Sequence, residues 1–521
     1  GGNFTMKFKK LIAVSSALIM SLGVLTGCSS TSNSSSGGNS GNNSAKSLVF
    51  ADTQSPNNLN PHQDWNGWYV SRYGIGETLF KLDDKLNVTP FLVDTYESTD
   101  NTTWVFKLKD GITFSNGNKV DAEAVKASLE DTLKVNERAV ELYNVDTIEA
   151  DDLTLTIKTK DANPGLPASL CEPMGIIVDV NDKENSDTNP ICTGPFVATG
   201  YKEKTQFDVA KNENYWNGDV KLDSATFKVL ADTSALDMAT KSGEVDVAVS
   251  MPNTSLDDYK NDDNYTISSN AGSRAQMLFL NYSNKFIQDK NVREAISLCI
   301  DRDKYNETLN NGGSTAAKGL YPTYVSYCGS GYEFNVEKAK KLLKDAGYKD
   351  TDNDGILEKD GEKLSLKLIT YSTKAELPTF SEALKSQLAE IGVELNVQIV
   401  DNMMDECKNG NFDISLWSFT MLPTGDPQYF IDIAFASNGS SNYGKYSNSE
   451  VDTLTKELDS EFDTKKRDEL ASDIVDKVMD DYGYIAIGHA NYTYVMNKKV
   501  KNCVANPSEY YLLDANVDIQ E

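Results

Sequence analysis

The sequence predicts an α/β protein built from more than one domain, and three observations support this prediction. Segments with strand alternation are interspersed with segments of helical spacing along most of the chain. About 475 residues remain after a polar N-terminal stretch, more than a single hydrophobic core organises. Alternation of this kind is typical of sheets covered by helices, and not of all-helical or all-strand proteins.

The individual elements follow from the spacing of apolar residues. Alternating or short apolar runs predict strands at 48–51, 104–108, 153–159, 364–370, 393–400 and 413–419. Helical spacing predicts amphipathic helices at 122–133, 292–299, 336–346 and 380–391. Asp121 stands where the first of these helices begins and is expected to cap it.

The N-terminal segment has the layout of a secretory signal peptide. Met6 is followed by Lys7, Lys9 and Lys10 and then by an apolar run over 11–25, too short for a comfortable bilayer span of about 20 residues. The run ends at Leu-Thr-Gly-Cys28, which resembles the lipobox of bacterial lipoproteins. That resemblance implies a signal peptide over 6–27 and a lipid on Cys28.

A polar tether follows Cys28. Residues 29–44 are almost entirely Ser, Gly, Asn and Thr, a composition that buries no apolar surface and behaves as a flexible linker. No later stretch is apolar enough to cross a bilayer. We therefore expect a globular body held by its lipid at the extracytoplasmic face of the cell membrane, with the segment 28–45 between anchor and body.

The charge balance excludes one class of partner. After removal of the signal peptide, 47 Lys and Arg face 78 Asp and Glu, a net charge of −31. Such a chain repels nucleic acid and anionic lipid surfaces. The balance suits cationic ligands, but a solubilised secreted surface is the simpler interpretation.

Cysteine and histidine usage argues against a metal centre and against catalysis. Six further cysteines, Cys171, Cys192, Cys299, Cys328, Cys407 and Cys503, are dispersed without a CxxC pair, so they form no zinc cluster and stay open as free thiols or disulfides. His62 and His489 are the only histidines, which excludes a HExxH helix. We therefore expect a protein that is not an enzyme and that holds neither a cofactor nor a resident metal.

One acidic loop carries a metal hypothesis. Asp350, Asp352 and Asp354 alternate before Gly355, as in the first half of a calcium loop. The twelfth position is Gly361 instead of a bidentate Glu. An acidic double turn that leads into the strand at 364–370 is therefore the favoured interpretation, and calcium binding stays open.

An ordered set of motifs spans about 46–510. It comprises Leu59-Asn-Pro-His62, Trp104-Val-Phe-Lys-Leu-Lys-Asp-Gly-Ile-Thr-Phe-Ser-Asn-Gly117, Val120-Asp-Ala-Glu-Ala-Val125, Thr193-Gly-Pro-Phe196, Asn212-Glu-Asn-Tyr-Trp216, Val292-Arg-Glu-Ala-Ile-Ser-Leu-Cys-Ile-Asp-Arg302, Val336-Glu-Lys-Ala-Lys-Lys-Leu-Leu-Lys-Asp-Ala-Gly-Tyr348, Gly425-Asp-Pro427, Ser441-Asn-Tyr443 and Tyr446-Ser-Asn448. In this order the motifs resemble those of the family 5 extracellular solute-binding proteins, the peptide- and nickel-binding components of ABC importers. Each motif alone is modest evidence, and the shared order is the stronger signal.

The resemblance implies a two-lobed, periplasmic-binding-protein-like fold of class II, with ligand enclosed between the lobes. Lobe one would comprise 46–280 and 486–521, with an extra subdomain near 88–190, and lobe two would comprise 281–485. It also implies a monomer that delivers a small solute to an ABC permease in the cytoplasmic membrane.

The identity of the ligand is less defined by the resemblance. Peptide-binding relatives hold the peptide amine with an Asp at the position of Pro423, and nickel-binding relatives carry a Trp at the position of Met421. Neither specificity is inherited intact. A short peptide is the first expectation, with Glu172 or Asp426 as the replacement acid, and nickel or a metal chelate is the alternative.

Candidate ligand-binding residues follow from position and chemistry. The aromatic and apolar candidates are Trp65, Trp68 and Tyr69 after the first strand, and Trp417, Phe419 and Met421 at or after a predicted strand. Arg274 could clamp a carboxylate bidentately or form a surface ion pair. His489 lies in the return crossover at 484–494, where a hydrogen-bonded hinge histidine is favoured over ligand contact.

Two other classes of function stay open. A secreted hydrolase would need a convergent acid/base pair, and no spacing supports one. A sensor or adhesin lipoprotein with the same fold would have the same sequence pattern, and an adjacent permease and ATPase gene pair would separate the importer from the sensor.

Overall fold

The structure is a computed structural model that describes residues 45–182 and 186–520. The described residues belong to one compact unit that begins at Ala45. The predicted signal peptide, the lipid site Cys28 and the tether lie outside the described residues. Within the described ranges, no helix combines the length and the apolar character needed to cross a bilayer.

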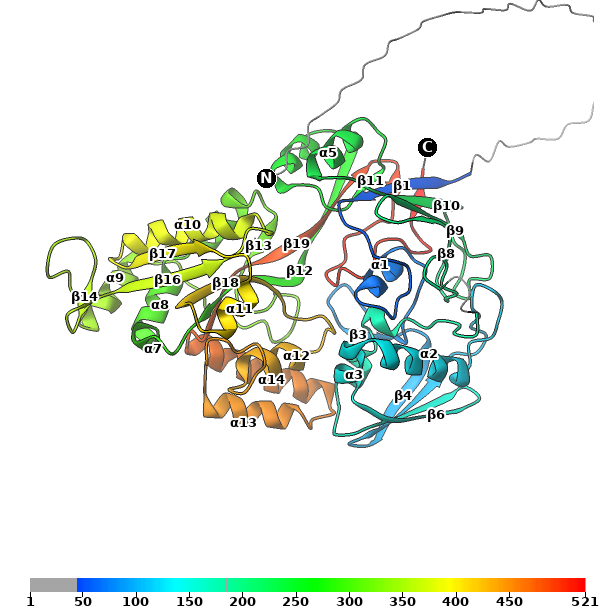
Figure 1. Ribbon diagram of the computed structural model, residues 1–521, viewed down its shortest axis with the longest axis horizontal. Helices are drawn as coiled ribbons and strands as arrows, with labels where there is room; N and C mark the ends of the chain where they lie inside the picture. The colour runs from blue at the N-terminus through cyan, green and yellow to red at the C-terminus, as the bar shows by residue number, and fades with distance from the viewer. Residues whose placement is uncertain (1–44, 183–185, 521) are drawn as a thin grey trace, which may run out of the picture. The chain divides into compact units, whose positions relative to one another are not determined.

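An eleven-stranded sheet is the largest sheet in the described part of the chain (Figure 1). Its strands are β1 (Ser47–Asp52), β8 (Phe196–Lys202), β9 (Gln206–Lys211), β10 (Ser224–Val229), β11 (Val247–Ala248), β12 (Tyr265–Leu280), β13 (Ser314–Ala316), β16 (Ser365–Thr370), β17 (Glu394–Ile399), β18 (Ile414–Thr420) and β19 (Tyr484–Asn497). Their order is β17-β16-β18-β12-β19-β11-β1-β10-β9-β8, and β13 pairs with β19 outside this path.

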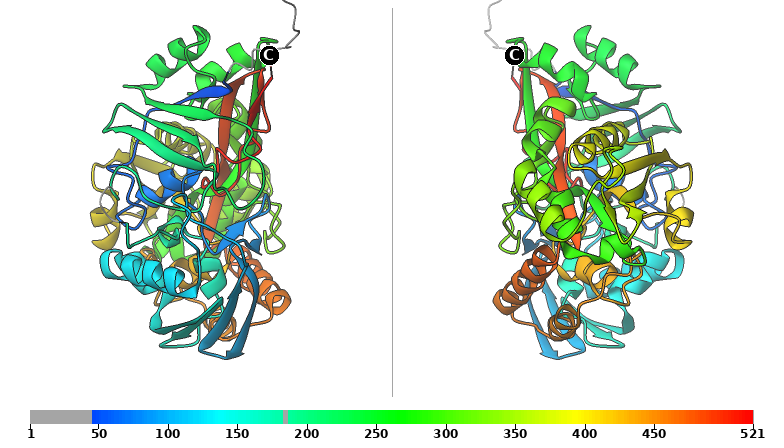
Figure 2. Two further views of the ribbon diagram at one scale, coloured as in Figure 1. Left: turned by 90° about the vertical axis from the view of Figure 1, so that its right-hand side faces the viewer. Right: turned by 90° about the vertical axis from the view of Figure 1, so that its left-hand side faces the viewer.

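The two long strands β12 and β19 connect the halves of this sheet. They pair antiparallel from Tyr265 opposite Asn497 to Phe279 opposite Tyr484, with a register shift between Ala271 and Ala275. On one side β11, β1 and β10 continue the sheet, and on the other β18, β16 and β17 do so. Figure 1 shows β12 and β19 running between the two halves, and Figure 2 shows the long red-to-orange strand from the side. The pair therefore joins two lobes, whose boundaries at 280/281 and 485/486 stay a prediction.

The first half of the sheet is covered by short helices. These are α1 (Asn66–Arg72), α5 (Thr233–Lys241), η2 (Asn253–Ser255) and α6 (Leu256–Lys260). Leu48 and Phe50 alternate with more accessible residues on β1 and are buried, as the sequence pattern predicts. The C-terminal segment adds the small pair β20 (Val500–Lys501) and β21 (Asp518–Ile519), which packs against the same core.

A second, four-stranded sheet carries one wall of the candidate site. It has the order β4 (Val93–Asp100), β5 (Thr103–Leu108), β7 (Thr154–Thr159) and β6 (Val145–Asp151). Around it lie the hairpin β2 (Phe80–Leu82) and β3 (Val88–Pro90), the helices α2 (Ala122–Val135), α3 (Glu137–Tyr143) and α4 (Leu166–Ser169), and the short 3₁₀ turn η1 (Pro173–Gly175). Asp121 accepts a hydrogen bond from Ala124 N at 3.0 Å, which confirms the predicted cap of α2.

Helices dominate the other lobe, which follows β12 in sequence. They are α7 (Lys285–Gln288), α8 (Lys290–Leu298), η3 (Lys304–Leu309), α9 (Val336–Asp345), α10 (Glu376–Ala389), α11 (Met403–Lys408), α12 (Gln428–Phe430), η4 (Ile431–Phe435), α13 (Ser449–Leu458) and α14 (Thr464–Asp480), with the hairpin β14 (Glu358–Lys359) and β15 (Glu362–Lys363). The predicted helices are confirmed within a few residues. The largest shift is in α10, which begins at Glu376 instead of Phe380.

A shared apolar core joins the four-stranded sheet to the helices α12–α14. Phe106 and Ile157 of the small sheet belong to the same buried cluster as Phe430 and Val475. At the edge of this contact the ring of Trp104 lies 5.7 Å from that of Phe462. This packing brings α3 and α4 opposite the loop before α12, where the candidate site lies.

The six cysteines of the described ranges have free thiols. Five are buried, and Cys328 is partly accessible. Of the two possibilities that the sequence left open, the structure therefore contains the thiols and not the disulfides.

Candidate ligand-binding site

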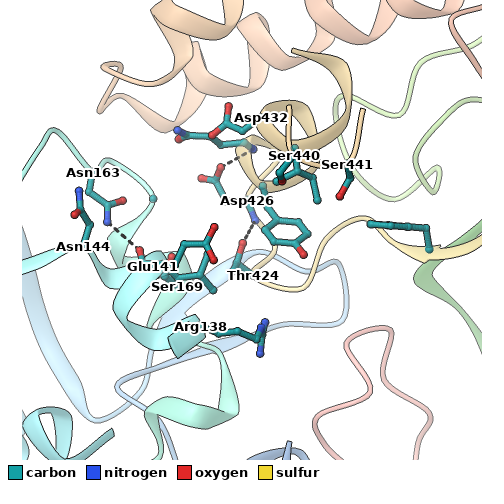
Figure 3. A pocket seen from close by; sticks show the side chains of 16 residues that line it. Arg138, Glu141, Asn144, Asn163, Ser169, Thr424, Asp426, Asp432, Ser440 and Ser441 are labelled. Carbon is teal, nitrogen blue, oxygen red and sulfur yellow. Dashed lines mark hydrogen bonds between the residues drawn. The ribbon is translucent and has the colours of Figure 1, made fainter. Parts of the chain in front are cut away.

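A cavity of about 490 Å³ lies between the small sheet's helices and the segment that leads from β18 into η4 (Figure 3). Its volume falls within the ~300–1,000 Å³ that is usual for small-molecule sites. The first wall contains Arg138, Glu141, Asn144, Asn163 and Ser169, and the second contains Phe419, Thr424, Asp426, Gln428, Tyr429, Asp432, Ser440 and Ser441. Opposite walls of the cavity thus come from chain segments far apart in sequence.

Arg138 is the cation of the first wall. It stands in the first turn of α3, which begins after Asn136, whose side chain accepts a bond from Ala139 N at 3.4 Å. The guanidinium lies 4.2 Å from the centre of the Trp65 ring and donates from Nη2 to Glu172 Oε1 at 2.8 Å. Burial alone would lower the pKa of Arg138, but the neighbouring Glu172 raises it, so the guanidinium keeps its charge. The side chain is 30% exposed and lines the cavity.

Glu172 lies behind Arg138 and not in the cavity wall. Its side chain has no exposure, and its Oε2 atom has no hydrogen-bond partner in the described residues. Burial raises the pKa of this carboxyl, and the charge of Arg138 offsets part of that rise. The expectation that Glu172 holds a ligand amine does not fit this arrangement, because the carboxyl is enclosed, does not line the cavity and bonds to Arg138 instead.

The second wall is acidic, but one of its acids is already paired. Asp426 accepts two hydrogen bonds from Arg467. Nη2 donates to Oδ1 at 2.7 Å, and Nε donates to Oδ2 at 3.3 Å. Asp432 is the other acid, and burial together with the neighbouring Asp459 raises its pKa to about 8. Such a pair shares a proton at neutral pH because two close carboxylates cannot both ionise cheaply.

Aromatic side chains complete the cavity. Phe419 and Tyr429 line it. The Phe419 ring packs 5.4 Å from Phe430 and 5.8 Å from Phe279, which fixes it against the core. The cavity therefore offers a cation, hydroxyl and amide groups, and two aromatic surfaces to a compact polar solute.

The structure brings only some of the predicted site residues to this cavity. Phe419 and Asp426 line it, and Trp65 is 51% exposed beside it, under Arg138. Trp68 lies one layer further in, where its ring packs 5.4 Å from Tyr510.

Three further aromatic and apolar expectations need correction. Trp417 is 9% exposed and packs on Phe279, Tyr371 and Tyr443, so it supports the wall without forming it. Met421 is fully buried. Tyr69 contacts Tyr73 and Arg72 away from the cavity.

Arg274 and His489 also lie outside the cavity lining. Arg274 donates from Nη1 to the carbonyl of Ser418 at 3.1 Å, and its Nη2 lies 3.9 Å from Glu509 Oε1. His489 is 2% exposed on β19, opposite Ala275 of β12. Burial lowers its pKa to about 4, with a partial offset from the carbonyls of Gly319 and Tyr321. It lies in a connecting strand, but neither of its ring nitrogens has a hydrogen-bond partner within bonding distance among the described residues, so the expected hydrogen-bonded hinge histidine is not observed.

Sequence reasoning missed Arg138, Tyr429 and Asp432. For Arg138 a signal existed, because the chain contains only six arginines among its 50 basic residues. A lysine-rich chain keeps arginine where a planar, multidentate donor is needed. Tyr429 and Asp432 follow the Gly-Asp-Pro motif, but nothing in their spacing distinguishes them from other residues near a helix start.

Two further features are a second cavity next to the candidate site and the acidic loop that the sequence analysis singled out. A second cavity of about 550 Å³ flanks the other side of the segment Gly425–Pro427 and is lined by Trp104, Phe462 and Arg467 among others. In the acidic loop, carboxylates of Asp350, Asp352, Asp354 and Glu358 lie within 4.8 Å of one another. Lys363 forms ion pairs with Asp352 and Asp354, which supports the interpretation as an acidic turn.

Comparison with known proteins decides the family. Residues 87–442 match the bacterial extracellular solute-binding proteins, family 5 (middle part). The chain belongs to this family. As a family 5 solute-binding protein it is extracellular, binds a small solute and is not an enzyme.

Two family 5 relatives with named ligands are similar to this chain over most of its length. The nickel-binding protein NikA of Staphylococcus aureus is 30% identical over 519 residues, covering 99% of this chain and 100% of that protein. The oligopeptide-binding protein AppA of Bacillus subtilis is 27% identical over 455 residues, covering 82% of this chain and 83% of that protein.

Solved structures agree on the two-lobed fold. A nickel ABC transporter protein from Bacillus halodurans superimposes with a TM-score of 0.85 at 29% identity, covering 91% of this chain and 100% of that one. NikA of Staphylococcus aureus in complex with Ni(L-His)2 superimposes with a TM-score of 0.71 at 29% identity and the same coverage. The fold class predicted from the sequence is thereby confirmed.

Proposed function

We propose that this family 5 protein is the lipid-anchored substrate-binding component of an ABC importer and that its cargo is nickel carried by small, carboxylate-bearing organic ligands. The observation that carries the choice of cargo is similarity over nearly the whole chain to NikA of Staphylococcus aureus, at 30% identity. That protein has been crystallised with Ni(L-His)2. The lipid on Cys28 and delivery to a permease are part of the proposal and follow from the lipobox and the family.

The chemistry of the cavity supports a chelate over a bare ion. Neither a histidine nor a cysteine is among the described residues that line it. Nickel bound directly by protein favours imidazole or thiolate ligands. A metal held here would therefore bring its own ligands, and Arg138 would bind a carboxylate of the complex through charge-assisted hydrogen bonds.

A short peptide, the first expectation from the sequence, is the second candidate here. Asp432 and Asp426 stand in the wall opposite Arg138 (Figure 3). An acidic wall facing a cation suits a zwitterion with an ammonium group at one end and a carboxylate at the other. The relative that supports a peptide ligand is the oligopeptide-binding protein AppA of Bacillus subtilis.

Isothermal titration calorimetry separates the candidates. The titrants are nickel chloride alone, nickel with two equivalents of L-histidine, and the dipeptide Ala-Ala. We expect heat from the nickel–histidine mixture and none from nickel alone. Binding of Ala-Ala with no response to the nickel–histidine mixture would reverse the order of the two candidates. Tight binding of nickel alone would remove the chelate from the proposal.

Arg138→Gln tests the carboxylate anchor. Hydrogen bonds to charged groups contribute about 1.5–3 kcal/mol, so the affinity should fall roughly 10- to 100-fold. Arg274→Gln is the matched control, because its side chain has a similar exposure, 24% against 30%, and lies outside the cavity. Equal losses in both variants, or a loss only in Arg274→Gln, would contradict the assignment of Arg138.

A further inference from the structure

Glu172 is a buried acid in which one of the two carboxyl oxygens has a hydrogen-bond partner among the described residues and the other has none. It follows α4 and precedes the turn η1, and its side chain has no exposure. Oε1 accepts the 2.8 Å bond from Arg138, whereas Oε2 is enclosed without a partner in the described ranges. A carboxylate in such a place is costly unless a cation compensates it. The stability of its charged form therefore depends on Arg138.

The side chain of Arg138 contacts both Glu172 and the cavity. A guanidinium has five N–H donors in a planar fork, and Glu172 takes one of them, from Nη2. The Trp65 ring, 4.2 Å away, supports the face of the guanidinium, and the side chain still lines the cavity. Arg138 thus has donors left for a second carboxylate while it remains bonded to Glu172.

We infer that Glu172 is a positioning residue that aims Arg138 at a ligand carboxylate, and that capture of this carboxylate transfers a proton from solvent to Glu172. The inference rests on the proposed function only in that the ligand carries a carboxylate, which both candidates do. The proton leaves hydronium or a buffer acid in the solvent, whose bond to it breaks, and forms an O–H bond on the Glu172 carboxyl; no other covalent bond changes. The ligand enters as a carboxylate and Glu172 becomes a neutral carboxylic acid.

The direction of proton movement follows from burial. A ligand carboxylate shares the charge of Arg138 and adds a like charge near Glu172, and both changes disfavour the ionised acid. The ligand group stays partly hydrated, whereas Glu172 is fully buried with one oxygen unpartnered. The proton is therefore taken up by Glu172 and not by the ligand.

Within residues 45–182 and 186–520, Arg138 is the charged group that acts on Glu172, and the other groups packed around this carboxyl are neutral. They are Tyr143 of α3, Tyr429 of α12, Cys171 beside it and Tyr510 of the C-terminal segment, and burial raises the pKa of each, so all are neutral near pH 7. Trp68 of α1, which packs near η1, carries no titratable group. Two further acids lie by these tyrosines, Glu141 beside Tyr429 and in the cavity lining, and Glu509 beside Tyr510.

The test combines a pH series with proton counting. Ala-Ala and the nickel–histidine complex are titrated between pH 6.5 and 8.5 in buffers of different protonation enthalpy. The wild-type protein should take up as much as one proton per ligand, with affinity rising by at most about tenfold per unit fall in pH. Glu172→Gln keeps the shape and an acceptor for Arg138, so it should bind within a few-fold of wild type and lose both the uptake and the pH slope. Comparison of these two proteins cancels protons taken up by the ligand.

Further variants separate positioning from folding. Glu172→Ala removes the acceptor and should lower affinity about tenfold, whereas Glu137→Gln, which changes an exposed acid of α3 that does not line the cavity, should keep the wild-type uptake. Wild-type protein that binds through Arg138 without proton uptake, or Glu172→Gln with unchanged uptake, would overturn this inference alone. Binding that is insensitive to Arg138→Gln would instead overturn the proposed function.

Discussion

The ion pair between Arg467 and Asp426 is the contact whose removal should cost the most stability near the site. Arg467 is 4% exposed on α14, and besides Asp426 it bonds to the carbonyls of Leu458 at 2.8 Å and Glu461 at 3.0 Å and to Gln428 Oε1 at 2.9 Å. Arg467→Met leaves these acceptors without their hydrogen-bond donor and leaves Asp426 without its cation. Breaking a buried pair from one side costs about 3–5 kcal/mol.

This cost converts into a modest shift in melting temperature because the protein is large. At about 2.1 cal/mol/K per residue, residues 46–521 unfold with an entropy of roughly 1 kcal/mol/K, so Tm should fall by about 3–5 °C. Differential scanning calorimetry measures the shift. Asp426→Asn alone should also lower Tm, and adding it to Arg467→Met should recover part of the loss, since the unpaired charge is then gone.

Two results would refute this reasoning. A Tm of Arg467→Met within 1 °C of wild type would show that the pair is energetically neutral. If Asp426→Asn weakened binding of Ala-Ala strongly while leaving Tm unchanged, Asp426 would be the amine anchor that the sequence predicted. Asp468→Asn is a suitable control on the same helix, because its carboxylate bonds to Ser326 and not to Arg467.

Four further outcomes are expected. Between about pH 4, the unfolded value for Asp, and the folded pKa of Asp432 near 8, the folded state holds the proton more tightly, so stability should fall as pH rises, and Asp432→Asn should flatten this decline in calorimetric scans. His489 shows the opposite sign: its folded pKa of about 4 means that stability is lost as pH falls below 6.5 through 4, and His489→Gln should reduce that loss in acid denaturation. Cys28→Ala should release the protein from membranes at unchanged affinity, and retention in the membrane fraction would contradict the lipid anchor. A saturating ligand at a hundredfold excess over Kd should add about 2.7 kcal/mol of stability and lower the radius of gyration in small-angle scattering, and an unchanged radius would argue against closure of the lobes.

Local elements were accessible from the sequence because their signals are local. The alternation at 104–108 and the cap at Asp121 involve residues within a few positions of one another, and both agree with β5 and α2. The order of motifs along the chain indicated the two-lobed fold through the family resemblance. Neither kind of signal depends on which surfaces finally meet.

The site was less accessible because its walls come from different lobes. Alternation placed Trp417 and Phe419 on one face of β18, but the strand is central and covered on both faces, so the pattern does not tell which residue reaches the cavity. Glu172 is an acid in a loop, and sequence gives no measure of its complete burial beneath Arg138. Arg138 itself is placed by α3 opposite Tyr429, a proximity that no spacing along the chain records.

The pairing of β12 with β19 has a consequence for how such proteins diversify. Phe279 and Tyr484 are direct partners across the two strands, so the chain enters and leaves the intervening segment at neighbouring points. Segments whose ends lie close together are readily exchanged or inserted as units. A recombination event at these two points would keep Arg138 and Glu172 from one parent and take Tyr429 and Asp432 from the other. Each half of the cavity can thus be inherited as a unit. New ligand preferences can arise when halves from two parents are combined, without any change of fold.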